Sequence, residues 1–173
     1  MTAARSHKLE KYGRLVHIIR HPRFPLEQVL MRLTQFTDFS LRLLIYAAAH
    51  PDRLVTVEEV ATAYGISRTH LTKVANGLGQ KSFLASVRGR SGGLRLARPP
   101  ERIVLGEVVR ATEPDFAIVE CFSSDESCML TPSCRLKGIL HGALGAFLDE
   151  MDRYTLADLV VDPARFGVRL PAA

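Results

Sequence analysis

The stretch TVEEVATAYGISRTHLTKVANGL, residues 56–78, decides the fold. Thr56 followed three residues later by Glu59 has the pattern of a capping box, and the apolar residues behind it predict a short helix. Gly65 predicts a tight turn, and Ser67 is expected to begin the next helix. A short helix, a glycine turn and a serine-capped helix form the layout of a helix-turn-helix.

The residues on both sides extend this unit. Residues 83–87 and 94–96 are expected to pair as a β-hairpin, joined by a turn in which three glycines can take positive φ. A hairpin directly after a helix-turn-helix is a wing. Upstream, Thr37 is expected to cap a helix that ends at His50-Pro51, with Asp38 in its first turn. Downstream, a short helix around Leu105, Val108 and Val109 is expected to end before Glu113-Pro114.

Residues 136–151 carry apolar side chains at i, i+3, i+4 and i+7, which predicts a helix of four to five turns with a broad apolar stripe. Nothing else in the chain obviously covers this stripe, so we expect a symmetric homodimer. The alternative is that the helix packs on its own winged domain. A last short helix is expected around Leu156, Leu159 and Val160.

The predicted fold class is therefore mainly α, with a small β-hairpin wing and a long C-terminal dimerisation helix. The expected division is an N-terminal extension that is poorly ordered (1–30), a winged helix-turn-helix domain (31–98, with the helix-turn-helix about 58–81 and the wing 83–96), a connector and cysteine loop (99–135), the dimerisation helix with the final helix (136–163) and a tail (164–173).

All three cysteines, Cys121, Cys128 and Cys134, lie within fourteen residues of polar loop composition. Thiolates gathered in such a loop favour an iron–sulfur cluster. A disulfide fits poorly with an odd count, and a zinc site that adds His141 would lack the usual short cysteine gap. A disulfide, the zinc site and three unrelated buried thiols remain open as alternatives.

The charge pattern points to a polyanionic partner. Residues 67–98 hold seven Lys/Arg and no acid, whereas residues 101–126 hold seven acids and two Arg. The candidate contacts to double-stranded DNA lie on the second helix of the helix-turn-helix and on the wing; they are Ser67, Arg68, Thr69, His70, Lys73, Arg88, Arg90 and Arg95. The alternative is a solvated basic face. No apolar run is long enough for a membrane span, and we expect a cytoplasmic protein.

Three stretches resemble one known family. They begin at Met31 (MRLTQFTDFSLRLLI), at Arg88 (RGRSGGLRL) and at Cys128 (CMLTPSCRLK), and together they resemble the bacterial iron–sulfur winged-helix transcriptional regulators. The resemblance covers about residues 31–163. The stretches TPSCRLK and YTLADLV, from Thr131 and Tyr154, look most like the nitric-oxide-sensing repressors of this family.

The resemblance implies a homodimer that holds one iron–sulfur cluster per subunit, [4Fe-4S] being favoured over [2Fe-2S]. It matches Cys121, Cys128 and Cys134 to the family's cysteine ligands, and it implies Asp38 from the partner subunit as the fourth ligand. The cluster form would bind the promoters of nitric oxide detoxification genes, and nitrosylation would release the DNA. Family members that read iron–sulfur supply carry a histidine where this chain has Lys137.

Two other functions stay open. One is a regulator of the same fold that reads iron or iron–sulfur supply. The other is an iron–sulfur protein of electron transfer. No glycine-rich cofactor loop and no arrangement of His, Cys and Asp pointing to catalysis is present in the sequence, so we expect no enzyme.

Overall fold

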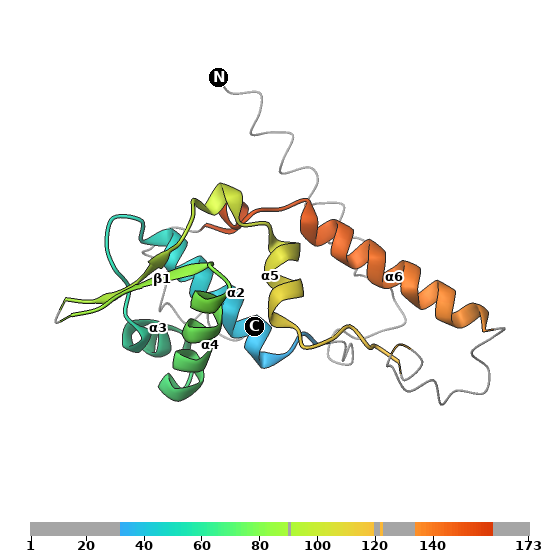
Figure 1. Ribbon diagram of the computed structural model, residues 1–173, viewed down its shortest axis with the longest axis horizontal. Coiled ribbons are helices and arrows are strands. Elements are labelled where there is room, and N and C mark those ends of the chain that lie inside the picture. Colours follow the sequence, from blue (N-terminus) through green and yellow to red (C-terminus); the bar gives the residue numbers. More distant parts are fainter. Residues whose placement is uncertain (1–31, 90, 120–121, 123–133, 161–173) are drawn as a thin grey trace, which may run out of the picture. The chain divides into compact units, whose positions relative to one another are not determined.

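The computed structural model describes residues 32–89, 91–119, 122 and 134–160, and Figure 1 shows their arrangement. These residues form α2 (Gln35–Ala49), α3 (Val57–Tyr64), α4 (Arg68–Gln80), β1 (Leu84–Val87), β2 (Gly93–Leu96), η2 (Pro100–Arg102), α5 (Leu105–Thr112), α6 (Arg135–Asp152) and η5 (Leu156–Leu159). All these elements belong to the unit that begins at Leu33. The predicted extension 1–30 and the tail 164–173 lie outside the described residues.

The prediction of a mainly helical chain with a small hairpin is confirmed. The apolar faces of α2, α3, α4 and α5 meet in one core, to which Leu84 and Leu94 of the hairpin contribute. Its fully buried side chains include Leu43, Leu44, Val60, Leu71, Leu78, Phe83, Ile103, Val108 and Leu156. The helical spacing that predicted α4 is the spacing of its buried residues, Leu71, Val74, Ala75 and Leu78.

The start of α2 differs from the prediction. The N-cap is Thr34, whose Oγ1 accepts a hydrogen bond from the backbone N–H of Thr37 at 3.3 Å. Thr37 is itself helical and buried. The carboxylate of Glu113, from the end of α5, accepts the backbone N–H of Thr34 at 2.8 Å and thereby fixes this helix start. Asp38 lies in the first turn, as predicted.

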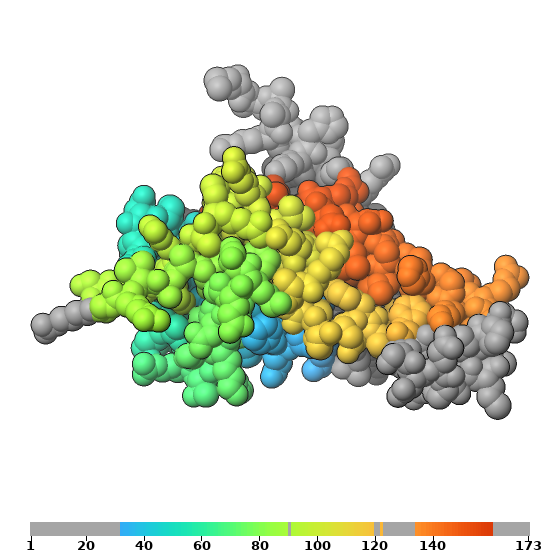
Figure 2. Space-filling view, in the orientation of Figure 1, coloured from blue at the N-terminus to red at the C-terminus, as the bar shows by residue number. Residues whose placement is uncertain are grey.

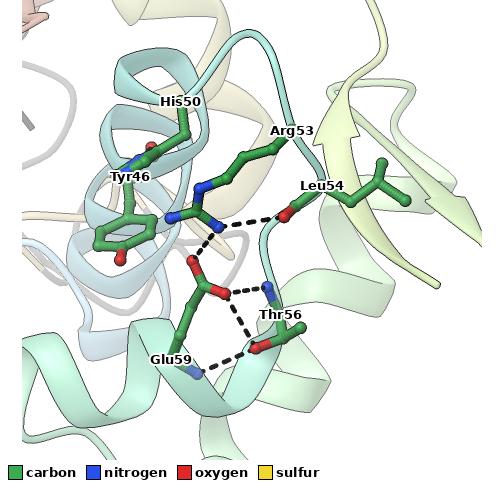
Figure 3. A network of polar contacts seen from close by, with 6 residues as sticks. All are labelled: Tyr46, His50, Arg53, Leu54, Thr56 and Glu59. Carbon is green, nitrogen blue, oxygen red and sulfur yellow. Dashed lines mark hydrogen bonds and ion pairs between the residues drawn. The ribbon is translucent and has the colours of Figure 1, made fainter. Parts of the chain in front are cut away.

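The start of α3 agrees with the prediction. Thr56 and Glu59 form the expected capping box, and the left-handed Gly65 (φ 65°) ends the helix. Figure 3 shows that the Glu59 carboxylate also accepts a hydrogen bond from Arg53 at 2.7 Å, while Arg53 donates to the carbonyl of Leu54 at 3.2 Å. These hydrogen bonds link the segment between α2 and α3 to the first turn of α3. Ser67 does occupy the N-cap position of α4, but its side chain makes no capping hydrogen bond.

The wing is an antiparallel pair in which Leu84 lies opposite Leu96 and Val87 opposite Gly93. Its base is held by Val55, which exchanges two backbone hydrogen bonds of 2.9 and 2.7 Å with Leu94. The expectation of positive φ at three glycines is wrong for two of them, because only Gly89 adopts it (φ 124°). A Cβ atom on Gly93 would lie 2.8 Å from the carbonyl oxygen of Val55, so this glycine permits close packing instead.

The helix α6 is 18 residues long, and none of its residues is buried. Leu136 and Ile139, in its first turns, are 57% and 66% exposed. The apolar stripe predicted for this helix is therefore left uncovered at its N-terminal end by the described part of the same chain. None of the helices in that part is long and apolar enough to cross a membrane.

Candidate DNA-binding surface and cysteine site

The outer face of α4 is exposed and free of acidic side chains. Arg68, Thr69, His70 and Lys73 are all exposed, while the opposite face carries the buried core residues. The hydroxyl of Ser67, which the helix does not use as a cap, lies at the N-terminal end, where free backbone N–H groups favour a phosphate. Asn76 is exposed as well. It was missing from the predicted residues, although it follows Lys73 by three positions and Thr72 by four.

Two basic residues of the acid-free segment 67–98 have acidic partners from outside that segment. Arg68 pairs with Glu58 of α3 at 3.2 Å, and Arg98 pairs with Glu107 of α5 at 2.6 Å. The Arg68 pair is exposed and therefore weak, so phosphate can compete for this guanidinium. Arg98 contacts the fold itself, because its guanidinium also lies 5.0 Å from the centre of the Phe83 ring.

The hairpin carries further arginine residues beside α4. Arg88 and Arg95 are exposed, and Arg90 lies outside the described residues. A groove of about 440 Å³ separates the hairpin from the C-terminal half of α4, and its lining includes Asn76, Gln80 and Ser86. In Figure 2 the hairpin extends away from the body of the unit beside α4. A helix and a basic hairpin placed in this way can contact a groove and the neighbouring backbone of one duplex.

Of the three cysteines, Cys134 lies within the described residues, and Cys121 and Cys128 lie outside them. Cys134 is a partly exposed free thiol at the N-cap of α6. The first turn after it contains no acid and has Arg135 and Lys137, so the positive end of the helix favours a thiolate or another anionic group at Cys134.

The described neighbour of Cys121 also lies against this helix. The ring of Phe122 is 6.1 Å from the ring of His141 in α6, so Phe122 lies beside the helix that follows Cys134. Among the residues that the structure describes, no three His, Cys, Asp or Glu side chains already form a metal site. A soft, anionic metal group suits the free thiol of Cys134 and the basic first turn of α6.

Asp38 has a partner that the sequence analysis did not identify. Its carboxylate accepts hydrogen bonds from Arg42, one turn later, with contacts of 3.0 and 2.9 Å. The Arg42 guanidinium also lies 5.8 Å from the centre of the Tyr64 ring in α3. Both charged side chains are close to half exposed, so the carboxylate can leave Arg42 for another cation. The i, i+4 spacing was the available signal for this pair.

Comparison with known proteins places these features in a family. The family model described as "Rrf2: Iron-dependent Transcriptional regulator" matches residues 33–162. The HTH-type transcriptional regulator NsrR of Shouchella clausii is 49% identical over 134 residues, which cover 76% of this chain and 90% of the relative. NsrR of Bacillus subtilis is 50% identical over 132 residues, covering 75% and 90%.

Solved structures share the fold at lower identity. T. potens IscR superposes with a TM-score of 0.60 at 22% identity, over 75% of this chain and 86% of that one. CymR, the global cysteine regulator of B. subtilis, gives a TM-score of 0.58 at 21% identity, over 75% and 96%. At such identities the likeness concerns the fold, and it confirms the winged-helix prediction.

Proposed function

Because the chain belongs to the Rrf2 family of transcriptional regulators, we propose that it is a nitric-oxide-sensitive repressor that binds a two-fold operator as a homodimer. Membership of this family agrees with the prediction that the chain is not an enzyme. The main support for DNA binding is the outer face of α4, which is exposed and has no acidic residue of the helix. This helix follows α3 and the Gly65 turn, as in a helix-turn-helix.

In this proposal the N-terminal half of α4 enters the major groove. Arg68 donates to guanine or phosphate, and Ser67, Thr69, His70 and Lys73 supply further donors. The wing contacts phosphate or the minor groove through Arg88, Arg90 and Arg95. The cytoplasm is the expected location of such a protein.

The cofactor part of the proposal is one iron–sulfur cluster per subunit, [4Fe-4S] or [2Fe-2S]. Cys121, Cys128 and Cys134 would bind it, with Asp38 of the other subunit as the fourth ligand. When bound, such a cluster supplies iron that reacts with nitric oxide. The chain itself contributes the thiolates, the basic first turn of α6 and a carboxylate that Arg42 holds while it is not a ligand. Support comes from the cysteine pattern, the free Cys134 and the relatives named NsrR.

DNA binding is tested by gel shift of anaerobically purified protein against excess random DNA. We expect retention of a specific promoter fragment and a steep dependence on salt. Arg88→Ala should lower the slope of log affinity against log salt by about 0.9 if Arg88 neutralises one phosphate. Arg102→Ala, an exposed arginine in η2, is the matched control and should leave the slope unchanged. An equal slope for wild type and Arg88→Ala would contradict the role of the wing.

The cofactor is tested by iron content and visible absorbance. Cys128→Ala should yield colourless protein, and Ser133→Ala, beside Cys134, should remain coloured. Nitric oxide should bleach the wild-type protein and release the promoter fragment. Colourless wild-type protein that binds its promoter fully would exclude the cluster as the regulatory group.

A second candidate function is regulation by iron or iron–sulfur supply, which the family description "Iron-dependent" favours. The two are separated by the signal that releases DNA. The iron-supply function would be favoured if the protein releases the promoter fragment when a chelator lowers free iron within the range found in cells, but keeps the fragment under nitric oxide.

A further inference from the structure

The helix α6 is attached at one end to the winged unit, the name used here for α2 to α5 with the hairpin. Its C-terminal residue Asp152 binds Arg110 of α5, with contacts of 2.7 and 2.5 Å. The backbone that follows is also tied down, because Leu105 donates to the carbonyl of Tyr154 at 2.9 Å and Leu156 is fully buried. Figure 1 shows this end of α6 beside α5, while the end that begins at Cys134 extends away.

Gly106 makes room for this attachment. A Cβ atom at Gly106 would overlap Oδ1 of Asp152 and would lie 2.9 Å from Nη1 of Arg110. A glycine inside a helix costs about 1 kcal/mol relative to alanine, and the φ of Gly106 does not lie in the left-handed region. A Cβ atom at Gly106 would therefore displace the ends of the Asp152 and Arg110 side chains from their present contact.

The Arg110–Asp152 pair is better suited to fix an angle than to add stability. Both side chains are substantially exposed, at 42% and 38%, and exposed ion pairs contribute little to the free energy of unfolding. Two parallel N–H···O bonds nevertheless impose one plane and one direction on the partners. The hydrogen bonds from Arg110 lower the pKa of Asp152, so the carboxylate stays charged at neutral pH.

We propose that Arg110 and Asp152, seated on Gly106, are positioning residues that set the angle between α6 and the winged unit. The inference rests on the proposed function, a homodimer on a two-fold operator, with α6 as the predicted dimerisation helix and one winged unit on each half-site. An 18-residue helix is about 27 Å long, so turning it by about 10° at this end displaces the other end by roughly 5 Å. The angle at the Gly106–Arg110–Asp152 clamp therefore determines the half-site spacing that a dimer accepts.

The test measures spacing preference. Wild-type protein first selects two-part sites from random double-stranded DNA, and the selected site is then remade with the half-sites moved by one to about three base pairs. Arg110→Lys keeps the charge but loses the fork, and Gly106→Ala pushes Asp152 away. Both variants should bind the original spacing about tenfold more weakly, with the preference shifted or flattened, while binding to a single half-site changes less than about twofold.

Two controls make the result specific. Arg153→Lys removes the guanidinium of the C-cap residue of α6, which pairs with Glu150 at the same end of the helix and not with α5, and should leave the spacing profile unchanged. Gly106→Ala should also unfold at a temperature no lower than wild type, because alanine favours the helix. Thus a loss of DNA spacing without a loss of stability is the expected signature.

The proposal is overturned if Arg110→Lys and Gly106→Ala keep the wild-type spacing profile, or if they weaken half-site and full-site binding equally. The proposed function fails separately, at the first step, if the wild-type protein selects no two-part site; the clamp would then have no spacing to set. If Gly106→Ala does not fold, two other variants give the test. Arg110→Lys should lose the wild-type spacing preference, and the charge-swapped double variant Arg110→Asp/Asp152→Arg should restore it.

Discussion

The winged unit and α6 are stabilised in different ways. The unit has a core of fully buried side chains contributed by α2, α3, α4, α5 and the hairpin. In α6 no residue is buried, and Gly138, Gly142 and Gly145 have nothing within 4 Å of where a Cβ would stand. The described part of the chain leaves apolar side chains of α6 uncovered, whereas the winged unit encloses its own core.

The largest expected effect tests this difference directly. Phe83 is 1% exposed under the hairpin, and Phe83→Ala should lower the free energy of unfolding by about 3–5 kcal/mol. Ile139→Ala removes a large apolar side chain from the uncovered face of α6 and should change the stability of the monomer by less than about 0.5 kcal/mol. Urea unfolding at low protein concentration measures both. Similar losses would remove the distinction between the two regions.

The next effect concerns the partner that α6 is proposed to have. A charge in the middle of an apolar interface is costly, so Ile139→Glu should weaken the homodimer by about a hundredfold or more. Val87→Glu is the matched control, because Val87 is also an exposed apolar residue (41%) but lies in the hairpin. Sedimentation over a range of concentrations measures the dissociation constant. A dimer that tolerates Ile139→Glu would have to use another surface.

Glycines give opposite predictions in the two regions. Gly93→Ala would press a Cβ atom against the backbone of Val55 and should destabilise the unit by about 1–3 kcal/mol. Gly142→Ala meets open space in α6 and should stabilise the isolated helix by about 1 kcal/mol. Thermal unfolding of both variants checks the signs. A destabilising Gly142→Ala at dimer-forming concentrations would instead locate Gly142 in the subunit contact.

The elements of this fold could be predicted from local sequence because local chemistry determines them. The capping box at Thr56 and the spacing of Leu71 and Val74 act within one or two turns. The N-cap of α2 could not be predicted in this way. Thr34 and Thr37 are both competent caps, and Glu113, 79 residues away, decides in favour of Thr34.

The same limit applies to the candidate site. The basic residues of α4 and the wing could be identified from composition, but their acidic neighbours could not. Glu58 reaches Arg68 only because the Gly65 turn folds α3 against α4. Gly106 could not be interpreted without Asp152, which lies on another helix. Long-range partners determine which charges are free and which glycines are required, and a single sequence carries no local signal for either.

The smallest expected effect tests whether the polar closure of the winged unit contributes to its stability. Burial raises the pKa of Glu59, but the hydrogen bonds from Arg53 and Thr56 outweigh it, and the pKa is lowered overall from 4.5. A carboxyl group with a lowered pKa in the folded state stabilises the protein above its unfolded pKa, and this contribution is lost as pH falls through the folded pKa. Wild type should therefore lose stability more steeply than Glu59→Gln below about pH 4.5, by less than about 1 kcal/mol in total.

Urea unfolding at several pH values between 3 and 6 measures this difference. Glu101→Gln, an exposed residue of η2, is the control and should follow the wild-type curve. If Glu59→Gln also follows that curve, the Arg53–Glu59–Thr56 network adds nothing to stability. The closure between α2 and α3 would then depend on apolar contacts alone, with Val55 and Leu94 as the remaining backbone link to the wing. A flatter curve for Glu59→Gln would instead show that the Arg53–Glu59–Thr56 network stabilises the unit.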